Sequence, residues 1–214
     1  MALAIQLSEV LDNFQLNAPA QVKHDINKSR LEVTASFRRD AAIQEGAVLP
    51  AFELVNADGG KTSSADLLAK GPILVTFYRG GWCPFCNLAL RDLQSNLDAF
   101  KAKGINLVAI SPELPDQSLS TLEKNELGFS VLSDIGNVFA RKLCIVWKQP
   151  ETLRPHSKAF GNDLQVINGD DSLEVPVPCT LLVDQRSIVR SVYIEADYTK
   201  RLDGSIPLAW ADEL

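Results

Sequence analysis

Cys83 and Cys86 are the residues of this sequence whose type and spacing best suit chemistry. They lie three positions apart, so on a helix both sulfurs face the same side of its first turn. That separation allows a disulfide bond. A pair of thiols that can pass between thiolate, sulfenic acid and disulfide acts as a redox switch. The motif therefore predicts a thiol-dependent oxidoreductase.

The elements around the motif favour the reactive thiolate form. Residues 72–77 form a continuous apolar run, which is typical of a strand buried on both faces, and Pro84 suits the first turn of a helix. The N-terminus of a helix offers unpaired N–H donors and a partial positive charge, and both lower the pKa of a thiol. Arg79 adds a full positive charge if its side chain turns inward. We therefore expect a lowered thiol pKa at this helix.

Two other interpretations of the cysteines stay open: a pair of inert buried thiols, and half of a zinc site completed by Cys144 and Cys179. Single cysteines far downstream and a total of two histidines do not fit the spacing of zinc ribbons. We therefore predict neither a metal nor another cofactor. Cys144 and Cys179 are expected to pack as small apolar residues, His24 and His156 to lie at the surface, and residues 170–171 to form a polar loop.

Periodicity and turn residues predict strands that alternate with helices along the chain. Strands are expected at 52–55, 72–77, 106–110, 129–132, 180–183 and 188–194, and helices at 64–69, 84–103, 119–127, 137–143 and from about 198. This alternation, followed by a terminal hairpin, predicts an α/β fold with a mixed central sheet and helices on both faces. In such sheets, functional sites gather at the carboxyl ends of strands, where Cys83 and Cys86 fall.

Residues 1–45 are expected to form an N-terminal helical extension to a domain at 46–214. Apolar residues recur at helical spacing on both sides of Pro19, which predicts two amphipathic helices. Packing of their apolar faces on the main domain is favoured over a dimer contact. Within the domain, the proline-rich and turn-rich residues 148–177 are expected to form an irregular inserted loop, and a loop of that length is often functional.

The charge balance argues against nucleic acid and anionic membranes as partners. The 214 residues include 27 acidic and 21 basic side chains, for a formal charge of −6, and no basic stripe offsets it. No apolar run has the length that spans a bilayer, and the first residues lack the pattern of a signal peptide. We therefore expect the protein in the cytoplasm.

Residues 77–86, with the sequence FYRGGWCPFC, resemble the active-site segment of the thioredoxin-like superfamily. They are most similar to the peroxiredoxin-like members of the alkyl hydroperoxide reductase/thiol-specific antioxidant (AhpC/TSA) family that carry C-x-x-C. Four further segments resemble the same family, at 46–54, 108–111, 131–134 and 178–184. The resemblance covers about residues 46–200 and implies a thioredoxin-like fold. Residues 1–45 and 148–177 are similar to additions in one peroxiredoxin-like subgroup.

Peroxiredoxins carry the pattern P-x-x-x-T-x-x-C, whose Thr and Cys bind the peroxide together with an Arg from a later strand. By this resemblance, Cys86 holds the peroxidatic position, Cys83 stands in place of the Thr and Arg79 in place of the Pro. The later Arg aligns near Pro178, so the resemblance indicates that it is missing. Pro178 is instead similar to the cis-proline that faces the cysteine pair in thioredoxins.

The resemblance implies two mechanisms. In the favoured one, Cys86 reduces hydrogen peroxide or an alkyl hydroperoxide and becomes a sulfenic acid, as in an antioxidant peroxidase. Cys83 then condenses with it, and thioredoxin or a similar dithiol reduces the disulfide. In the other mechanism, Cys83 attacks a disulfide of another molecule and Cys86 resolves the mixed disulfide. A redox-inert interaction domain on the same fold is a third interpretation.

The residues that flank the motif are expected to support it. Tyr78 either donates a hydrogen bond near the thiols or packs in the core, and the core is favoured. Trp82 and Phe85 form either a docking surface for a partner or a cover for the site. Arg79 and Pro178 complete the predicted supporting set. Peroxiredoxin relatives often pair, so a homodimer is also expected.

Overall fold

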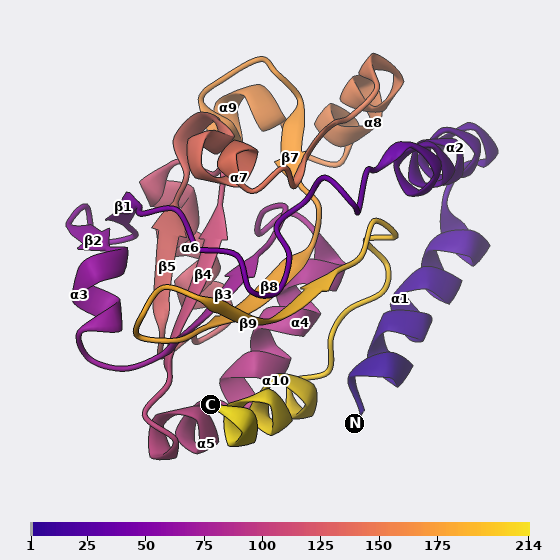
Figure 1. The fold of residues 1–214 in the computed structure, drawn as a ribbon. Coiled ribbons are helices and arrows are strands. Elements are labelled where there is room, and N and C mark those ends of the chain that lie inside the picture. Colours follow the sequence, from indigo (N-terminus) through magenta and orange to yellow (C-terminus); the bar gives the residue numbers. More distant parts are fainter. Residues whose placement is uncertain (1) are drawn as a thin grey trace.

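The computed structural model describes residues 2–214, and Met1, the first residue of the predicted extension, lies outside the described residues. A large sheet carries helices on both faces, and two helices precede it (Figure 1). The described helices are α1 (Leu3–Asn17), α2 (Ala20–Ser36), α3 (Ser64–Leu68), α4 (Pro84–Ser95), α5 (Leu97–Ala102), α6 (Pro115–Lys124), α7 (Val138–Lys142), α8 (Arg154–Ala159), α9 (Leu164–Asn168) and α10 (Ser205–Trp210). The strands are β1 (Glu53–Asn56), β2 (Lys61–Ser63), β3 (Ile73–Phe77), β4 (Asn106–Ser111), β5 (Ser130–Ser133), β6 (Val146–Lys148), β7 (Glu174–Pro176), β8 (Cys179–Val183) and β9 (Val189–Ile194).

The central sheet has seven strands in the order β2-β1-β5-β4-β3-β8-β9. Strand β3 lies inside the sheet, parallel to β4 and antiparallel to β8, and all five of its residues are buried. This is the burial expected of a continuous apolar run, because both faces of such a strand are covered. The prediction of a mixed sheet in an α/β fold, preceded by N-terminal helices, is confirmed.

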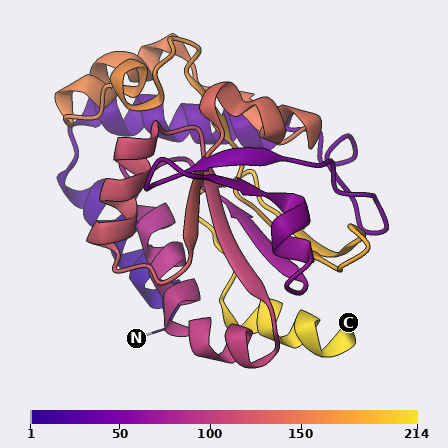
Figure 2. The same cartoon turned by 90° about the vertical axis from the view of Figure 1, so that its left-hand side faces the viewer.

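Alternate residues of β3 point into two separate cores. Leu74 packs in one core with residues of α1, α4 and α5, whereas Ile73 and Val75 pack in the other with residues of α3 and α7. The alternation follows from the two-residue repeat of a strand. Helices therefore cover both faces of the sheet, as Figure 2 shows from the side.

The two N-terminal helices pack on the rest of the molecule, as predicted. Leu3 and Leu7 of α1 are buried in the core that also holds residues of α4. Helix α2 lies beside α8 in both views, and the ring of His156 contacts the carboxylate of Asp25, with 2.7 Å between Nε2 and Oδ2 (Figures 1 and 2). Both helices thus lie against elements that surround the cysteine motif.

Several boundaries differ from the predictions. The helix expected at 84–103 is two helices, because the backbone leaves the helical region at Asn96 (φ −102°, ψ 3°). The helix expected at 119–127 begins earlier, since Pro115 occupies its first turn. The C-terminal helix begins at Ser205 rather than near 198, after a loop that carries part of the site.

The segment 148–177 is more regular than the predicted loop. It contains α8, α9 and β7, and β7 pairs with β6 in a separate two-stranded sheet. Prolines and polar residues that suggest a loop begin helices here instead, because Pro155 occupies the first turn of α8 and Asp163 caps α9. No helix within residues 2–214 is both long and apolar enough to cross a membrane.

Candidate active site

The cysteine motif lies where β3 ends and α4 begins, as the sequence predicts. Cys83 is the N-cap residue of α4, and its carbonyl oxygen accepts hydrogen bonds from the N–H groups of Cys86 and Asn87, both at 3.1 Å. Pro84 takes the first helical position, where its missing N–H costs nothing. Both cysteines therefore lie at the positive end of a helix dipole.

The loop before the motif requires glycine. A Cβ atom at Gly80 would lie 2.2 Å from the indole nitrogen of Trp82, and one at Gly81 would lie 2.1 Å from the hydroxyl of Thr121. Gly80 also has a φ of +145°, which residues with a side chain rarely adopt. The two glycines let the chain pass tightly between β3 and α4, which fixes the direction of the following cysteine.

The two cysteines lie 2.9 Å apart, and each is 1% exposed. They differ in what they face. Cys83 lines a cavity of about 290 Å³, which we call the Cys83 cavity, whereas Cys86 lines a space of only about 20 Å³ on the other side of α4. Of the two sulfurs, only that of Cys83 thus borders a space of the size of a small organic molecule.

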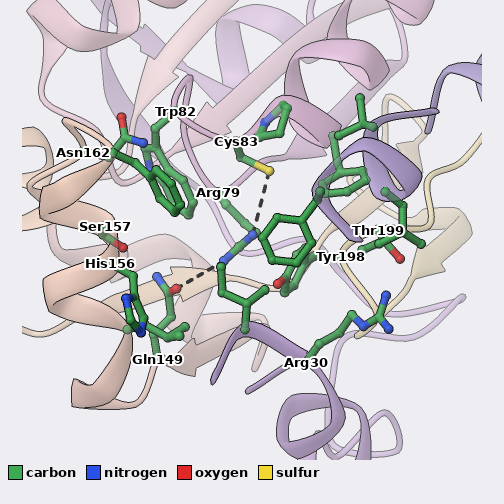
Figure 3. Close-up of a pocket in the computed structure, with 18 of the residues that line it drawn as sticks. Arg30, Arg79, Trp82, Cys83, Gln149, His156, Ser157, Asn162, Tyr198 and Thr199 are labelled. Atoms are coloured by element: carbon green, nitrogen blue, oxygen red, sulfur yellow. Dashed lines mark hydrogen bonds between the residues drawn. The ribbon is translucent and has the colours of Figure 1, made fainter. Parts of the chain in front are cut away.

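Arg79 turns inward and lies beside the sulfur of Cys83, as the sequence analysis anticipated. Its Nη1 is 3.8 Å from Cys83 Sγ, and its Nη2 donates to the side-chain oxygen of Gln149 at 3.2 Å. The guanidinium lies over the rings of Trp82 and Tyr198, 4.7 and 3.9 Å from their centroids (Figure 3). Among residues 2–214 no carboxylate forms an ion pair with Arg79, so a thiolate is the anion that this buried cation contacts.

Trp82 therefore has a defined place in the site. Its ring covers one side of Arg79 and borders the Cys83 cavity (Figure 3). A cation over an aromatic ring is attracted by the electrons of the ring face, and the attraction grows when water is excluded. Trp82 and Tyr198 thus hold the guanidinium in position without neutralising it.

Arg201 is a site residue that the sequence does not predict. Its Nη2 donates to Cys86 Sγ at 3.2 Å and lies 3.9 Å from Cys83 Sγ. The loop that carries it folds back onto α4, where the N–H of Gly204 donates to Asp92 at 2.6 Å. The resemblance indicates that the later arginine, which aligns near Pro178, is missing, but Arg201, just beyond the segment covered by the resemblance, brings a second guanidinium to the cysteines. A lone arginine in a polar loop gives no local signal of this contact.

Pro178 does not take the place expected for it. No peptide bond among the described residues is cis, so the likeness to the cis-proline of thioredoxins is wrong in this respect. Pro178 precedes β8, its carbonyl oxygen accepts from the N–H of Glu195, and its side chain borders the small space beside Cys86. It is thus a wall residue on the Cys86 side of the pair.

The environment divides the pair into a thiolate and a thiol. Burial alone opposes a charge on Cys83, but the thiol of Cys86 and the guanidinium groups of Arg79 and Arg201 outweigh it and lower the pKa of Cys83 from 9.0 to about 5. Burial and the neighbouring Cys83 sulfur raise the pKa of Cys86. The two groups share one proton at neutral pH, which we assign to Cys86 because Cys83 has the more favourable contacts.

The buried carboxyl group of Glu113 holds the glycine loop through a hydrogen bond. Glu113 is 2% exposed, and its Oε1 accepts from the N–H of Gly81 at 2.9 Å. Its Oε2 lies 3.4 Å from the hydroxyls of Tyr78 and Thr121, and burial raises the pKa of this carboxyl to about 7. The Tyr78 hydroxyl thus donates to Glu113, while the Tyr78 ring packs in the core that also holds both cysteines. Glu113 lies two residues after the end of β4, a position at which sequence reasoning could have sought a polar site residue.

The remaining candidates lie away from the reacting sulfurs. Cys179 is buried opposite Phe77 in the sheet, and burial raises the pKa of its thiol well above the usual range, as suits an inert core residue. Cys144 is exposed rather than packed. His156 is half-buried and held by Asp25 rather than free at the surface. The described residues contain no group of three or more His, Cys, Asp or Glu side chains arranged to hold a metal.

Comparisons with known proteins show which family the chain resembles. The AhpC/TSA family matches residues 46–192. Peroxiredoxin Bcp of Escherichia coli (strain K12) is 30% identical over 92 residues, which are 43% of this chain and 58% of that protein. Peroxiredoxin Q, chloroplastic, of Populus jackii is 27% identical over 153 residues, 72% of this chain and 61% of that protein. The chain thus spans about six tenths of the length of these curated relatives.

Solved structures show the same fold at low sequence identity. The structure of peroxidoxin BcpB from Mycobacterium tuberculosis matches with a TM-score of 0.64 and 17% identity, over 80% of this chain and 98% of that one. The bacterioferritin comigratory protein of Xanthomonas campestris matches with a TM-score of 0.58 and 14% identity, over 76% of this chain and 90% of that one. These matches confirm the predicted thioredoxin-like fold.

Proposed function

This chain belongs to the AhpC/TSA family, and on that premise we propose that it is a thiol peroxidase that reduces hydrogen peroxide or an alkyl hydroperoxide. The observation that carries the proposal is the Cys83 sulfur at the wall of a cavity, near the guanidinium groups of both Arg79 and Arg201. A thiolate is the nucleophile in such chemistry, and a thiol of low pKa is ionised at neutral pH.

In the proposed first step, the Cys83 thiolate attacks one oxygen of the hydroperoxide. A sulfur–oxygen bond forms, the oxygen–oxygen bond breaks, and the second oxygen leaves as an alcohol or water after taking up one proton. The products are a sulfenic acid on Cys83 and the reduced peroxide. The guanidinium of Arg79, already 3.8 Å from the sulfur, lies where it can stabilise the negative charge that moves onto the departing oxygen.

In the second step, the Cys86 thiol condenses with the sulfenic acid. A disulfide forms and one water leaves, so the two electrons taken from the pair equal those given to the peroxide. The 2.9 Å separation of the cysteines and the contact of Arg201 with Cys86 Sγ support this step. An external thiol reductant, expected from the sequence to be thioredoxin or a similar dithiol, then restores both thiols.

This order of attack reverses the one that the family resemblance implies. The resemblance gives Cys86 the peroxidatic position, but three observations support Cys83: its N-cap position, its lowered pKa and its place on the larger cavity. Cys86 instead has a raised pKa and faces a space too small for an alkyl hydroperoxide. We therefore propose Cys83 as the peroxidatic and Cys86 as the resolving cysteine.

The disulfide-reductase alternative rests on the same thiolate. A lowered pKa on the first cysteine of C-x-x-C also suits attack on a disulfide, but the 1% exposure of Cys83 disfavours a protein substrate. Reduction of insulin disulfides tests it directly. The expected homodimer and cytoplasmic location stay predictions.

Single substitutions of the cysteines test the proposal. Cys86→Ser should still react with one equivalent of peroxide and keep a sulfenic acid on Cys83, whereas Cys83→Ser should lose peroxide turnover. The assays are peroxide consumption with a thiol reductant and trapping of sulfenic acid with a dimedone reagent. Peroxide turnover that survives in Cys83→Ser assigns the attack to Cys86. No consumption by the unmodified chain supports the redox-inert interpretation instead.

A further inference from the structure

Segments outside the residues that match the family build part of the Cys83 cavity. Val10 and Leu11 of α1 and Ile26 of α2 form one wall, and Tyr198 follows the matched region. Phe160 lines the cavity and is 55% exposed, so the cavity reaches the surface there. Figure 3 shows Gln149, His156 and Ser157 together on one side of the cavity and Arg30 of α2 on the other side.

The same walls restrict what can reach the sulfur. For a protein cysteine to form a mixed disulfide with Cys83, its Cα atom must come within about 7 Å of the Cα of Cys83. The partner's backbone would then have to enter a cavity of about 290 Å³, close to the lower limit for pockets that hold small molecules. Helices α1 and α2 contribute walls of that cavity, so a partner's backbone would have to displace them. A free small thiol needs no such displacement.

The cavity also carries unused hydrogen-bonding capacity. Gln149 is 3% exposed, its side-chain oxygen accepts from Arg79, and its side-chain nitrogen, although buried, has no hydrogen-bond partner among residues 2–214. A buried donor without a partner is costly unless a ligand or water satisfies it. Arg30 lines the same cavity, and its acidic neighbour Asp197 is 4.0 Å away. Arg30 suits an oxygen acceptor with negative charge, and the Gln149 amide suits a further oxygen acceptor.

We propose that the Cys83 cavity binds a low-molecular-weight thiol that carries a carboxylate, and that this thiol is the reductant of the Cys83–Cys86 disulfide. The apolar walls hold the carbon chain of the thiol, Arg30 binds its carboxylate, and the side-chain nitrogen of Gln149 is free to donate to a further oxygen of the ligand. This proposal rests on the proposed function in one respect, that turnover forms this disulfide. It names the class of electron donor, which the family match does not.

The electrons balance over two thiol–disulfide exchanges. The small thiolate attacks Cys83 Sγ from the cavity, a mixed disulfide forms at Cys83, and Cys86 leaves as a thiolate beside Arg201 Nη2. A second small thiolate then attacks the small molecule's sulfur, which releases the Cys83 thiolate and a symmetrical small-molecule disulfide. Two thiols are oxidised and one protein disulfide is reduced.

Reduction of the preformed disulfide tests the proposal without peroxide. The full chain is oxidised with diamide, and loss of the disulfide is followed by quenching, alkylation and mass spectrometry. The probes are glutathione, mercaptopropionate and mercaptoethanol, each normalised to its rate with a free small-molecule disulfide. We expect rates that saturate with glutathione and mercaptopropionate, and a non-saturating rate with mercaptoethanol, which lacks the carboxylate. Thioredoxin should reduce the disulfide with a lower second-order rate constant than glutathione.

Two variants of α2, each of which removes one positive charge, form a matched pair. Arg30→Gln should raise the half-saturating concentration of mercaptopropionate about ten-fold, the loss expected for one hydrogen bond to a charged group. Lys28→Gln removes the same charge from an exposed position of the same helix and should change nothing. Mercaptoethanol should not distinguish the two variants.

Three results overturn the proposal: rates without saturation for both carboxylate thiols, equal behaviour of Arg30→Gln and Lys28→Gln, or faster reduction by thioredoxin than by glutathione. The comparison of thiols on the unmodified chain keeps the test valid if Arg30→Gln does not fold. Because diamide forms the disulfide, a failure here is distinct from a failure of peroxidase activity, which the peroxide assay measures separately.

Discussion

Replacing Arg79 by methionine should raise the pKa of Cys83. The Nη1 atom of Arg79 lies 3.8 Å from Cys83 Sγ, and two aromatic rings hold its guanidinium there. Methionine keeps much of the apolar length of the side chain but carries no charge. The Cys83 thiolate then loses one of its two cationic neighbours, and the neutral thiol becomes relatively more stable.

The size of the shift follows from the distance. Coulomb's law with an effective dielectric constant of about 20 gives about 4 kcal/mol for unit charges about 4 Å apart. The guanidinium spreads its charge, and Arg201 stays 3.9 Å from the same sulfur, so we expect about half of that value, or about 1.5 pKa units. The pKa of Cys83, about 5 in the parent chain, should rise to between about 6 and 7.

Alkylation of Cys83 by iodoacetamide across the pH range measures this shift, because only the thiolate reacts. A raised pKa removes thiolate at the acidic end of the range. Arg79→Met should therefore react more than about ten-fold slower than the parent near pH 5, and within about two-fold of it near pH 8. Peptide mapping assigns the label to Cys83 rather than to Cys144, which is exposed.

Arg190→Met is the control. Arg190 lies on the edge strand β9, pairs with Asp184 and does not border the Cys83 cavity. Its alkylation profile should match that of the parent. The electrostatic reasoning is refuted if Arg79→Met gives the parent's profile, or if both variants shift alike.

Three further changes test other contacts of the site. Arg201→Met removes the donor that lies 3.2 Å from Cys86 Sγ. We expect disulfide formation to slow about ten-fold or more, so that sulfenic acid accumulates and can be trapped by rapid quenching. An unchanged rate of disulfide formation contradicts a role of Arg201 in resolution. Burial raises the pKa of Glu113 from 4.5 to about 7, so the folded state holds this proton more tightly than the unfolded state does. The resulting stability is fully present below pH 4.5, and about 3 kcal/mol of it is lost as the pH rises through about 7. Glu113→Gln should abolish this loss, as denaturant unfolding near pH 4 and pH 8 can check, and a loss that persists assigns it to another group. Gly81→Ala places a Cβ 2.1 Å from Thr121 Oγ1 and should lower the free energy of unfolding by about 1–3 kcal/mol, so an unchanged urea midpoint argues against the tight passage of this loop.

The sequence predicts those parts of the fold that local patterns determine. The apolar run at 72–77 is strand β3 because a strand covered on both faces needs no polar alternation. Pro84 and the helical spacing after it locate α4, and hence the position of both cysteines at its N-terminus. The family resemblance, carried by residues 77–86, is confirmed for the same reason: its motif is contiguous in the chain.

The rest of the site depends on contacts that no local pattern encodes. Arg201 reaches the cysteines only because the loop after β9 returns to α4, and Glu113 reaches Gly81 across the end of β4. The spacing of C-x-x-C also cannot separate its two sulfurs. Their difference arises from the cavity on one side of α4 and the closed space on the other, which the N-terminal helices and the loop of Arg201 create.

The most direct test of the central proposal is the site of the first oxidation in the unmodified chain. The reduced protein is mixed with less than one equivalent of hydrogen peroxide in the presence of a sulfenic-acid trap, quenched before the disulfide forms, and mapped by peptide mass spectrometry. We predict that the trap labels Cys83, whose sulfur borders the cavity and carries the lowered pKa. A label found on Cys86 instead contradicts the assignment and restores the order of attack that the family resemblance implies.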